Sequence, residues 1–360
     1  MLVRSKPFLP AIAIALAACS SSFAAEQPLP LQDKVHFFTY ENDVRFMTDR
    51  FYTSGVQFST KQSTDQRGAF ARRFTGALCG WMGCAADDQF LTSQANLGQL
   101  VYTPQDITRR EPQPLDRPWG GLLYYEQAYT FISANQRTLT TLTGQAGVTG
   151  KLSLAEPAQK LFHEIRDRPR PEGWDNQIGG SLGVLVSAER RTAVDALSAD
   201  LWSDVRFNTA SYWRLAAGNI QTYAAAGLAV VIGKDLPAVS PPPPGIGTKL
   251  ATGAASKSAG NVACMVPWIQ CTAFGSVEGR VVGYNLFLDG RLLHNDPKAR
   301  RRKFVHDLVA GTRFDFPNTR TESHGPWFVQ FKITRRSREF KSPIPVPRHR
   351  VAALTLGTEF

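Results

Sequence analysis

The stretch Trp327-Phe-Val-Gln-Phe-Lys-Ile-Thr334 decides the fold class of this chain, because bulky apolar residues occupy every second position. In a β-strand, successive side chains point to opposite faces, so the odd-numbered residues form one apolar face. The same period of two recurs in Ala224–Ile232 and again in Leu354–Phe360. Segments of about ten residues with this weak alternation are typical of an outer-membrane β-barrel.

Twelve segments of the chain carry this kind of pattern. They lie near residues 35–42, 51–60, 94–103, 120–132, 138–149, 178–190, 198–210, 219–233, 271–287, 301–315, 327–340 and 350–360. An even number of antiparallel strands lets a sheet close into a barrel with both chain ends on one side. A soluble β-sandwich shows the same alternation in fewer, shorter strands. We therefore expect an all-β protein, a twelve-stranded antiparallel transmembrane β-barrel with one short α-helix.

The composition excludes two other classes. With 43% hydrophobic residues, the chain is too apolar to be disordered. Beyond the N-terminal segment, the longest apolar run is Ala224–Gly233, whereas a membrane-spanning helix needs about 20 residues. The formal net charge of +11 indicates an anionic partner, such as an acidic lipid.

The N-terminal segment has the features of an export signal. Two basic residues precede the short apolar run Phe8–Ala18. Ser22-Phe-Ala24 fits ordinary signal peptidase cleavage, whereas Leu16-Ala-Ala-Cys19 resembles a lipoprotein box, in which Cys19 would be lipidated. Both alternatives predict a signal peptide over residues 1–25 and an exported protein, which excludes nucleic acid as the partner.

The remaining residues, 26–360, are expected to form a single barrel domain with two long insertions. The insertions at about 61–92 and 234–267 are predicted to be outer loops, and the second is rich in proline, which cannot donate to a strand ladder. Each carries or adjoins a local cysteine pair, Cys79 with Cys84 and Cys264 with Cys271. In an oxidising compartment, these pairs indicate two loop disulfides.

One segment reads as a helix rather than a strand. Ser153-Leu-Ala-Glu156 has the spacing of a capping box, with Ser153 at the N-cap, and it opens a helix running to about Arg166. Gln159 and His163 stand four residues apart, so their side chains lie on the same helix face. A single helix in a barrel sequence with a polar pair on one face indicates a functional site, although a lone helical histidine is often structural.

Two further clusters contain residues able to do chemistry. Asn42-Asp43 precedes Thr48–Gly55; such a pair is often only a turn, but it also offers a carboxylate for a hard cation and an amide donor for an oxyanion. Arg109-Arg110 and Asp116-Arg117 are either solvated rim charges or forked donors for phosphate. The sequence has no Gly-x-Ser-x-Gly, HExxH or GxxxxGK motif.

Taken in order, these motifs resemble the lipid A 3′-O-deacylase family of Gram-negative outer membranes. The resemblance rests on the following segments: Asn42-Asp43, Asp49-Arg-Phe-Tyr-Thr-Ser-Gly55, Tyr102-Thr-Pro104, Asp116-Arg-Pro118, Gln159-x-x-x-His163 and Gly173-Trp-Asp-Asn-Gln177. It implies a hydrolase that removes the 3′-linked acyloxyacyl chain from lipid A of lipopolysaccharide, using a water activated by histidine and a calcium ion. The implied site lies between the barrel wall and the helix, at the level of the outer leaflet.

The resemblance also assigns roles to single residues. It implies that His163 is the general base, Asp43 is a calcium ligand, and Asn42 and Arg109 are oxyanion donors. Gln159 and Thr53 would complete the catalytic group. The phosphates of the substrate would account for a basic lip at Arg110 and Arg117.

One departure from the family pattern concerns the calcium ion. Pro169 stands where the family pattern has an acidic second ligand, which leaves Asp167 or Glu172 as substitutes. The sequence leaves two alternative functions open. One is an outer-membrane phospholipase, which needs a serine beside the histidine, and the other is a non-enzymatic barrel resembling a porin or adhesin. Lipopolysaccharide and membrane lipids are the expected partners.

Overall fold

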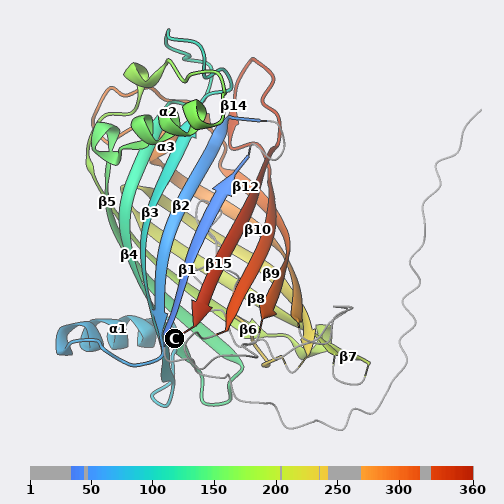
Figure 1. Cartoon of the computed structure of the whole chain (residues 1–360). Helices are drawn as coiled ribbons and strands as arrows, with labels where there is room; N and C mark the ends of the chain where they lie inside the picture. Colours follow the sequence, from blue (N-terminus) through green and yellow to red (C-terminus); the bar gives the residue numbers. More distant parts are fainter. Residues whose placement is uncertain are drawn as a thin grey trace, which may run out of the picture.

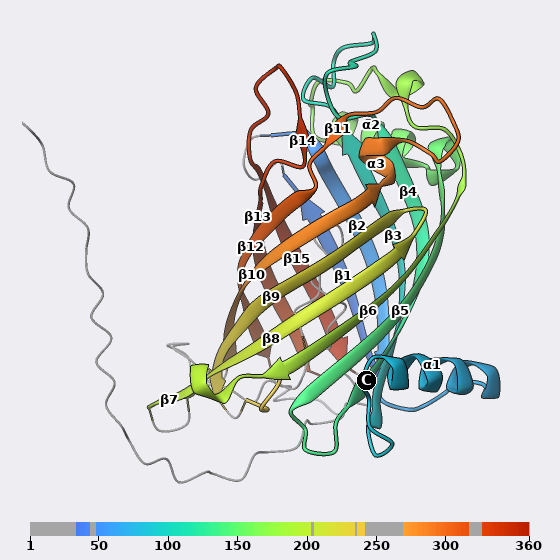
Figure 2. The ribbon, with the colours of Figure 1, turned by 180° about the vertical axis from the view of Figure 1, so that it is seen from behind.

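The computed structural model describes residues 34–43, 48–202, 205–234, 236–241, 269–316 and 326–359. Twelve strands of this described chain form one closed antiparallel barrel (Figures 1 and 2). They are β1 (Lys34–Asn42), β2 (Phe51–Gln62), β3 (Gln89–Thr103), β4 (Gly120–Ile132), β5 (Thr138–Thr149), β6 (Leu182–Ala193), β8 (Val205–Gly218), β9 (Gln221–Lys234), β10 (Gln270–Asn285), β12 (Phe304–Phe316), β13 (Trp327–Arg336) and β15 (His349–Glu359). Each strand pairs with its neighbours, and the pairs β1–β15 and β6–β8 close the circle. The predicted fold class is confirmed.

The other elements are short. Strand β7 (Ala199–Trp202) pairs with β8 alone, and β11 (Arg300–Arg301) pairs with β14 (Phe340–Lys341). The helices are α1 (Ala69–Trp81), α2 (Ala155–Ile165) and α3 (Leu286–Asp289). None of the helices in the described residues is both long enough and apolar enough to cross a membrane.

The alternation in the sequence separates the two faces of the wall. On β13, Phe331 and Ile333 are exposed, whereas Lys332 and Thr334 are buried in the barrel interior. The interior is therefore polar, as in other membrane barrels. Its charged groups are paired, for example Lys332 with Glu41 at 2.9 Å, because an unpaired buried charge is costly.

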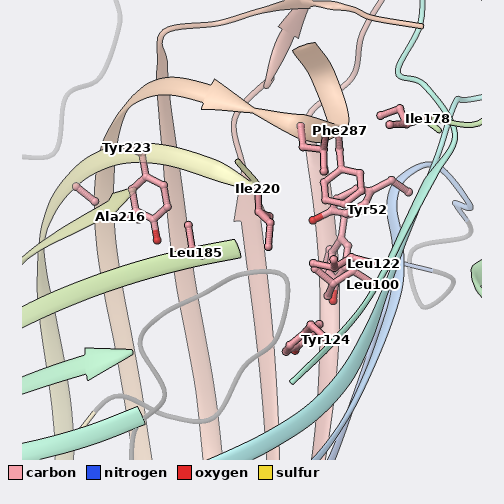
Figure 3. Close-up of a cluster of buried hydrophobic side chains, with 14 residues drawn as sticks. Tyr52, Leu100, Leu122, Tyr124, Ile178, Leu185, Ala216, Ile220, Tyr223 and Phe287 are labelled. Carbon is pink, nitrogen blue, oxygen red and sulfur yellow. The ribbon is translucent and has the colours of Figure 1, made fainter. Parts of the chain in front are cut away.

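The interior is filled at one end by an apolar cluster. Tyr52, Tyr124 and Phe287 of α3 belong to this cluster (Figure 3). Tyr102 belongs to it as well, and its ring stacks on that of Phe287 with the centroids 4.2 Å apart. Helix α2 lies at this same end, outside the wall (Figure 1). We call it the α2 end of the barrel.

Two predictions, about one strand and about the number of helices, are wrong. The strand expected at 198–210 is β8 at Val205–Gly218, because the row of buried residues continues through Tyr212, Arg214 and Ala216. The insertions at 61–92 and 234–267 were expected to be outer loops. The first contains α1 and lies at the end of the barrel opposite α2 (Figure 1), so the described chain has more helices than the one expected. Most of the second insertion lies outside the described residues.

The cysteine predictions are confirmed as far as the described residues extend. Cys79 and Cys84 form a disulfide, with their Cα atoms 5.2 Å apart. Cys271 is also disulfide-bonded. Its expected partner Cys264 lies outside the described residues, as do the predicted signal peptide and Cys19.

Candidate active site

Helix α2 begins one residue later than the sequence predicted and has no capping box. Gly150–Ser153 forms a 3-10 turn, and the hydroxyl of Ser153 donates to the carbonyl of Gly150 at 2.6 Å. Leu154 takes the N-cap position in a left-handed conformation, with φ of 57°. The side chain of Glu156 pairs with Lys160 at 2.6 Å instead of turning back to cap the helix. The tight turn therefore replaces the capping box.

The helix is fastened to the outer face of the wall. Gln99 and Val101 of β3 alternate with the inward-facing Leu100, so their side chains point outward. The amide of Gln99 donates to the carbonyl of Ser153 at 2.7 Å, and Val101 packs in a buried cluster with Ala155 at the start of α2. Consequently the space beneath α2 lies outside the barrel interior.

A cavity of about 150 Å³ lies between α2 and the wall. It is lined by residues of β1, β2, β3 and α2, together with Asp49 from the segment before β2. These residues are Tyr40, Asn42, Asp49, Thr53, Ser54, Val56, Gln99, Val101, Ala158, Gln159, Phe162 and His163. The structure thus brings together Asn42, Thr53, Gln159 and His163, four of the predicted site residues, and we call this space the catalytic cavity.

His163 is buried, and both of its ring nitrogens have partners. Its Nδ1 lies 2.7 Å from the carbonyl oxygen of Pro169, and its Nε2 lies 2.8 Å from Oδ2 of Asp49. A carbonyl only accepts, so Nδ1 carries a hydrogen and Nε2 is the nitrogen whose protonation changes. A carboxylate also only accepts, so when His163 is protonated the second proton lies between Nε2 and Asp49.

These contacts raise the pKa of His163 above its ordinary value. Burial works in the opposite direction, because it disfavours the charged imidazolium. The hydrogen bond and negative charge of Asp49, with the carbonyl of Pro169, outweigh burial, while the positive charge of Arg168 opposes them weakly. The contact with Asp49 therefore favours the protonated form of His163.

Asp49 connects the two polar residues of α2, a role the sequence did not assign to it. Its Oδ1 accepts from the amide of Gln159 at 3.4 Å while its Oδ2 contacts His163. On the other side, Nε1 of Trp174 donates to Oε1 of Gln159 at 2.9 Å. Trp174 comes from the Gly173–Gln177 motif, so this motif orients the helix face that enters the cavity.

Asp43 lies directly after β1 with its carboxylate fully buried. Its Oδ2 accepts from the hydroxyl of Thr48 at 2.8 Å and from the backbone N–H of Arg50 at 2.9 Å. Its Oδ1 is buried and has no hydrogen-bond partner. Burial raises the pKa of Asp43 to about 7, and the nearby charge of Asp49 adds to this against the hydrogen bonds.

The orphaned Oδ1 of Asp43 fits a ligand to a hard cation, because such an ion would supply the missing partner and stabilise the buried charge. No group of three or more His, Cys, Asp or Glu side chains able to hold a metal occurs in the described parts of the chain. The carbonyl of Pro169 is already hydrogen-bonded to His163. Asp43 is thus the residue that fits, and its further ligands would be backbone oxygens or water.

The predicted basic residues lie elsewhere. Arg109 is exposed, with Nε 3.8 Å from a carboxylate oxygen of Glu111, and Arg110 is also exposed. Arg117 is buried, with Nη1 2.8 Å from Glu339 and its guanidinium over the ring of Tyr102. None of these three arginines lines the catalytic cavity.

The fold and the site define a class of protein: a membrane β-barrel that carries a histidine–carboxylate site on the outer side of its wall. Residues 10–360 match the sequence profile of the family described as "Outer membrane protein LpxR", so the chain belongs to this family. The predicted family is confirmed, and the barrel is an outer-membrane protein. Among curated protein sequences, none matches the chain.

Of the three similar solved structures described next, the first supports the fold. "LpxR from Salmonella typhimurium" is 16% identical, with a TM-score of 0.65 over 91% of this chain and 100% of that chain. The "KdgM porin" is 7% identical, with a TM-score of 0.32 over 91% of this chain and 99% of that chain. The β-domain of the Bordetella autotransporter BrkA is 9% identical, with a TM-score of 0.40 over 92% and 100%.

Proposed function

We propose that this protein is a hydrolase that removes the 3′-linked acyloxyacyl chain from lipid A of lipopolysaccharide. The observation that carries the proposal is the buried His163–Asp49 pair in a cavity on the outer side of the wall. A site in this position is reached from the membrane and not through the barrel interior. Its substrate is therefore a lipid.

An apolar cavity of about 700 Å³ on the outer face of the wall supports the proposal that the substrate carries acyl chains. Its outward-facing lining includes Phe38, Phe58 and Leu97, each two residues along its strand from a residue of the catalytic cavity. The lining is mostly apolar and continues to Leu356 of β15. Acyl chains extending from an ester in the catalytic cavity would meet this surface.

The geometry supports a role for His163 as general base. Because Nδ1 donates to Pro169, Nε2 is the atom that accepts a proton from a water molecule entering beside Asp49. The water oxygen then bonds to the ester carbonyl carbon, and the bond from this carbon to the sugar oxygen breaks. The proton returns from Nε2 to the sugar oxygen, and Asp49 stabilises the imidazolium between these two steps.

The charge that forms on the carbonyl oxygen needs stabilisation. The amide of Asn42, in the cavity lining, is the proposed donor to this oxygen. Asp43 would hold a calcium ion, which when bound would supply positive charge that favours an oxyanion. Ser54 also lines the cavity, but the ring nitrogens of His163 contact Pro169 and Asp49 and not Ser54, so these contacts do not support a serine nucleophile.

Mass spectrometry of lipid A from cells expressing the protein tests the proposal. Wild type should remove the acyloxyacyl chain, and His163→Ala should lower kcat by about 10²- to 10⁴-fold, the usual contribution of a general base. His294→Ala is the matched control, because His294 is exposed and contacts only its own loop. Full deacylation by His163→Ala would refute the mechanism. Release of lysophospholipid with intact lipid A would identify a phospholipase instead.

A further inference from the structure

The segment Thr48–Arg50 separates the catalytic cavity from another cavity. Asp49 faces the catalytic cavity, whereas Thr48 and Arg50 on either side of it line a space of about 440 Å³. The same two residues also donate to the carboxylate of Asp43. The two cavities are therefore neighbours that share one short stretch of backbone.

The space of about 440 Å³ lined by Thr48 and Arg50 is strongly basic, and we call this space the arginine pocket. Besides Thr48 and Arg50 it is lined by Arg335, Arg338, Arg348, His349 and Arg350. Arg335 and Arg350 stand directly opposite each other on β13 and β15, and both side chains are exposed. Like charges at opposed positions of a sheet repel each other, so an anion bound between these two side chains would stabilise the pair.

Acidic groups near the arginine pocket already have other partners. Asp49 contacts His163, and Glu339 pairs with Arg117 and Arg336 inside the barrel. Nε of Arg50 is buried and has no hydrogen-bond partner. Across the described ranges, no ion pair involves Arg335, Arg338 or Arg348.

The position of the pocket matches the polar level of a membrane. Arg335 ends the exposed row that runs through Phe331 and Ile333 along β13, so it stands where the apolar band stops. Guanidinium groups form paired, charge-assisted hydrogen bonds with phosphate oxygens. We infer that the arginine pocket binds a phosphate group of the lipid whose acyl ester occupies the catalytic cavity. The inference rests on the proposed function for the identity of this lipid.

Binding measured without turnover tests this inference separately from hydrolysis. The affinity of the detergent-solubilised protein for lipid A, in EDTA, is compared with its affinity for lipid A from which the phosphates have been removed. Arg335→Gln/Arg350→Gln should weaken binding of the phosphorylated lipid by about tenfold or more, because two charged donors are lost. It should leave binding of the dephosphorylated lipid unchanged.

Arg300→Gln/Lys341→Gln is the matched control. These two residues are also exposed, basic and opposed across a strand pair, but they lie outside the arginine pocket. Equal loss in both double variants, or equal affinity of wild type for the two lipids, would overturn the inference. Binding of inorganic phosphate that depends on Arg335 and Arg350, together with equal affinity of wild type for the two lipids, would show that the pocket takes free phosphate and not a lipid headgroup. Retained phosphate-dependent binding in a protein that releases no acyl chain would refute the proposed function alone.

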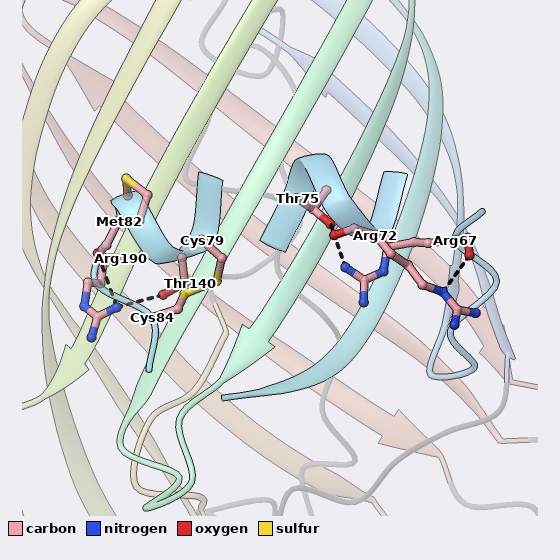
Figure 4. Close-up of a disulfide and its surroundings, with 8 residues drawn as sticks. All are labelled: Arg67, Arg72, Thr75, Cys79, Met82, Cys84, Thr140 and Arg190. Atoms are coloured by element: carbon pink, nitrogen blue, oxygen red, sulfur yellow. Dashed lines mark hydrogen bonds between the residues drawn. A yellow bond between two sulfur atoms is a disulfide. The ribbon is translucent and has the colours of Figure 1, made fainter. Parts of the chain in front are cut away.

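An independent observation concerns helix α1, which lies on the outer face of the wall at the opposite end. Cys79 and Met82 pack on Phe131, Leu142 and Ala188. These three residues alternate with buried, inward-facing residues of β4, β5 and β6, so α1 covers part of the lipid-facing wall. The disulfide and a hydrogen bond from Arg190 to the carbonyl of Met82 hold its C-terminal end there (Figure 4).

Three large aromatic residues of α1 share one exposed face. Phe70, Phe74 and Trp81 lie within about 40° of one another around the helix axis, given 100° per residue. Their exposed fractions are 83%, 54% and 72%, and the rings of Phe70 and Phe74 stack. The buried residues of the helix, Thr75 and Cys79, lie on a different side, toward the barrel.

We propose that this aromatic face inserts into the lipid leaflet at the end of the barrel opposite the catalytic cavity. The helix is continuous with the lipid-facing wall, and it lies crosswise to the barrel in both views (Figures 1 and 2). Aromatic residues are favoured at membrane interfaces, and the exposed Arg72 and Arg73 suit the phosphates of phospholipids. The helix would thus lie in the interface plane and brace the barrel.

Quenching by brominated lipids tests this second proposal. The full-length protein is reconstituted into phosphatidylethanolamine–phosphatidylglycerol vesicles, and the emission of Trp81 is obtained as the difference between wild type and Trp81→Phe. Vesicles brominated near the headgroup should quench this difference emission by half or more. Trp327, on the outer face of β13, serves as the lipid-facing reference through Trp327→Phe.

Phe70→Ser/Phe74→Ser should reduce the quenching of Trp81 and leave that of Trp327 unchanged. Quenching of Trp81 by aqueous iodide but not by brominated lipid would overturn the proposal, since the helix would then lie in water. Unboiled gel mobility of each variant checks that the barrel has folded.

Discussion

At the residue scale, the contact between His163 and Asp49 predicts a particular pH dependence. His163 acts as a base only when neutral, and Asp49 helps to raise its pKa, so activity should fall as the pH drops through that raised pKa. Asp49→Asn removes the negative charge and should move this acid limb to lower pH, while the rate on the alkaline plateau falls. The pH profile of kcat measures both effects. If the acid limb of the pH profile is at the same pH in Asp49→Asn as in wild type, the titration of another group causes the loss of activity.

The buried carboxylate of Asp43 predicts a dependence on calcium. Asp43→Asn keeps the shape of the side chain but removes one charged oxygen ligand, so the calcium concentration for half activity should rise. In wild type, protons should compete with calcium as the pH falls through about 7, the raised pKa of Asp43 without an ion. Half-activation by calcium, measured at several pH values, checks this. If Asp43→Asn leaves the calcium concentration for half activity unchanged, other residues hold the ion.

Local spacing predicted part of the site. The pairs Asn42-Asp43 and Gln159/His163 are short-range patterns; Asn42, Gln159 and His163 line the catalytic cavity, and Asp43 is hydrogen-bonded to the segment on either side of Asp49. The role of Asp49 could not be predicted, because its contact with His163 joins a segment before β2 to a helix more than 100 residues later. The arginine pocket likewise depends on the pairing of β13 with β15, which brings Arg335 opposite Arg350. Such contacts follow from barrel closure and have no local sequence signal.

At the element scale, α1 shows why the first insertion was read as a loop. Its sequence contains two glycines and a disulfide cysteine, and the helix is stabilised by packing on Phe131 and Leu142 of the wall. This packing cannot be predicted from the local sequence, because its partners lie on strands that come together only when the barrel forms. Helix α2, by contrast, was predicted from a capping box, and the helix is present one residue later although the predicted capping residue Ser153 belongs to the preceding turn.

The Cys79–Cys84 disulfide should stabilise α1 and not the barrel. It closes a short loop, which removes little entropy from the unfolded chain, so Cys79→Ser/Cys84→Ser should leave the heat resistance of the barrel on gels unchanged. Proteolysis between Arg67 and Asp88 should become faster, because the C-terminal end of the helix is released. Equal proteolysis of both proteins would show that Met82 and Arg190 suffice to hold the helix.

At the scale of the whole molecule, the filled interior predicts that this barrel is no pore. Arg214 pairs with Glu189 and Glu278 across the interior, and the cluster around Phe287 fills the α2 end. Purified protein in planar bilayers should therefore show no steady ion conductance. Steady open-channel currents would instead support the non-enzymatic porin alternative.

The strand number was predictable because each strand must alternate between lipid and a polar interior. Strand ends were less predictable where the chain leaves the wall, as at β8. There the two-residue period does not distinguish a short turn from the strand that follows it.

The position of the catalytic cavity outside the barrel also sets the kinetics. A substrate that reaches His163 within a leaflet diffuses in two dimensions, and its relevant concentration is a mole fraction of the surrounding lipids. Saturation would then depend on how densely the substrate is packed around the wall and not on the bulk volume of the sample. Diluting lipid A with inert lipid slows such an enzyme, whereas diluting the whole suspension does not.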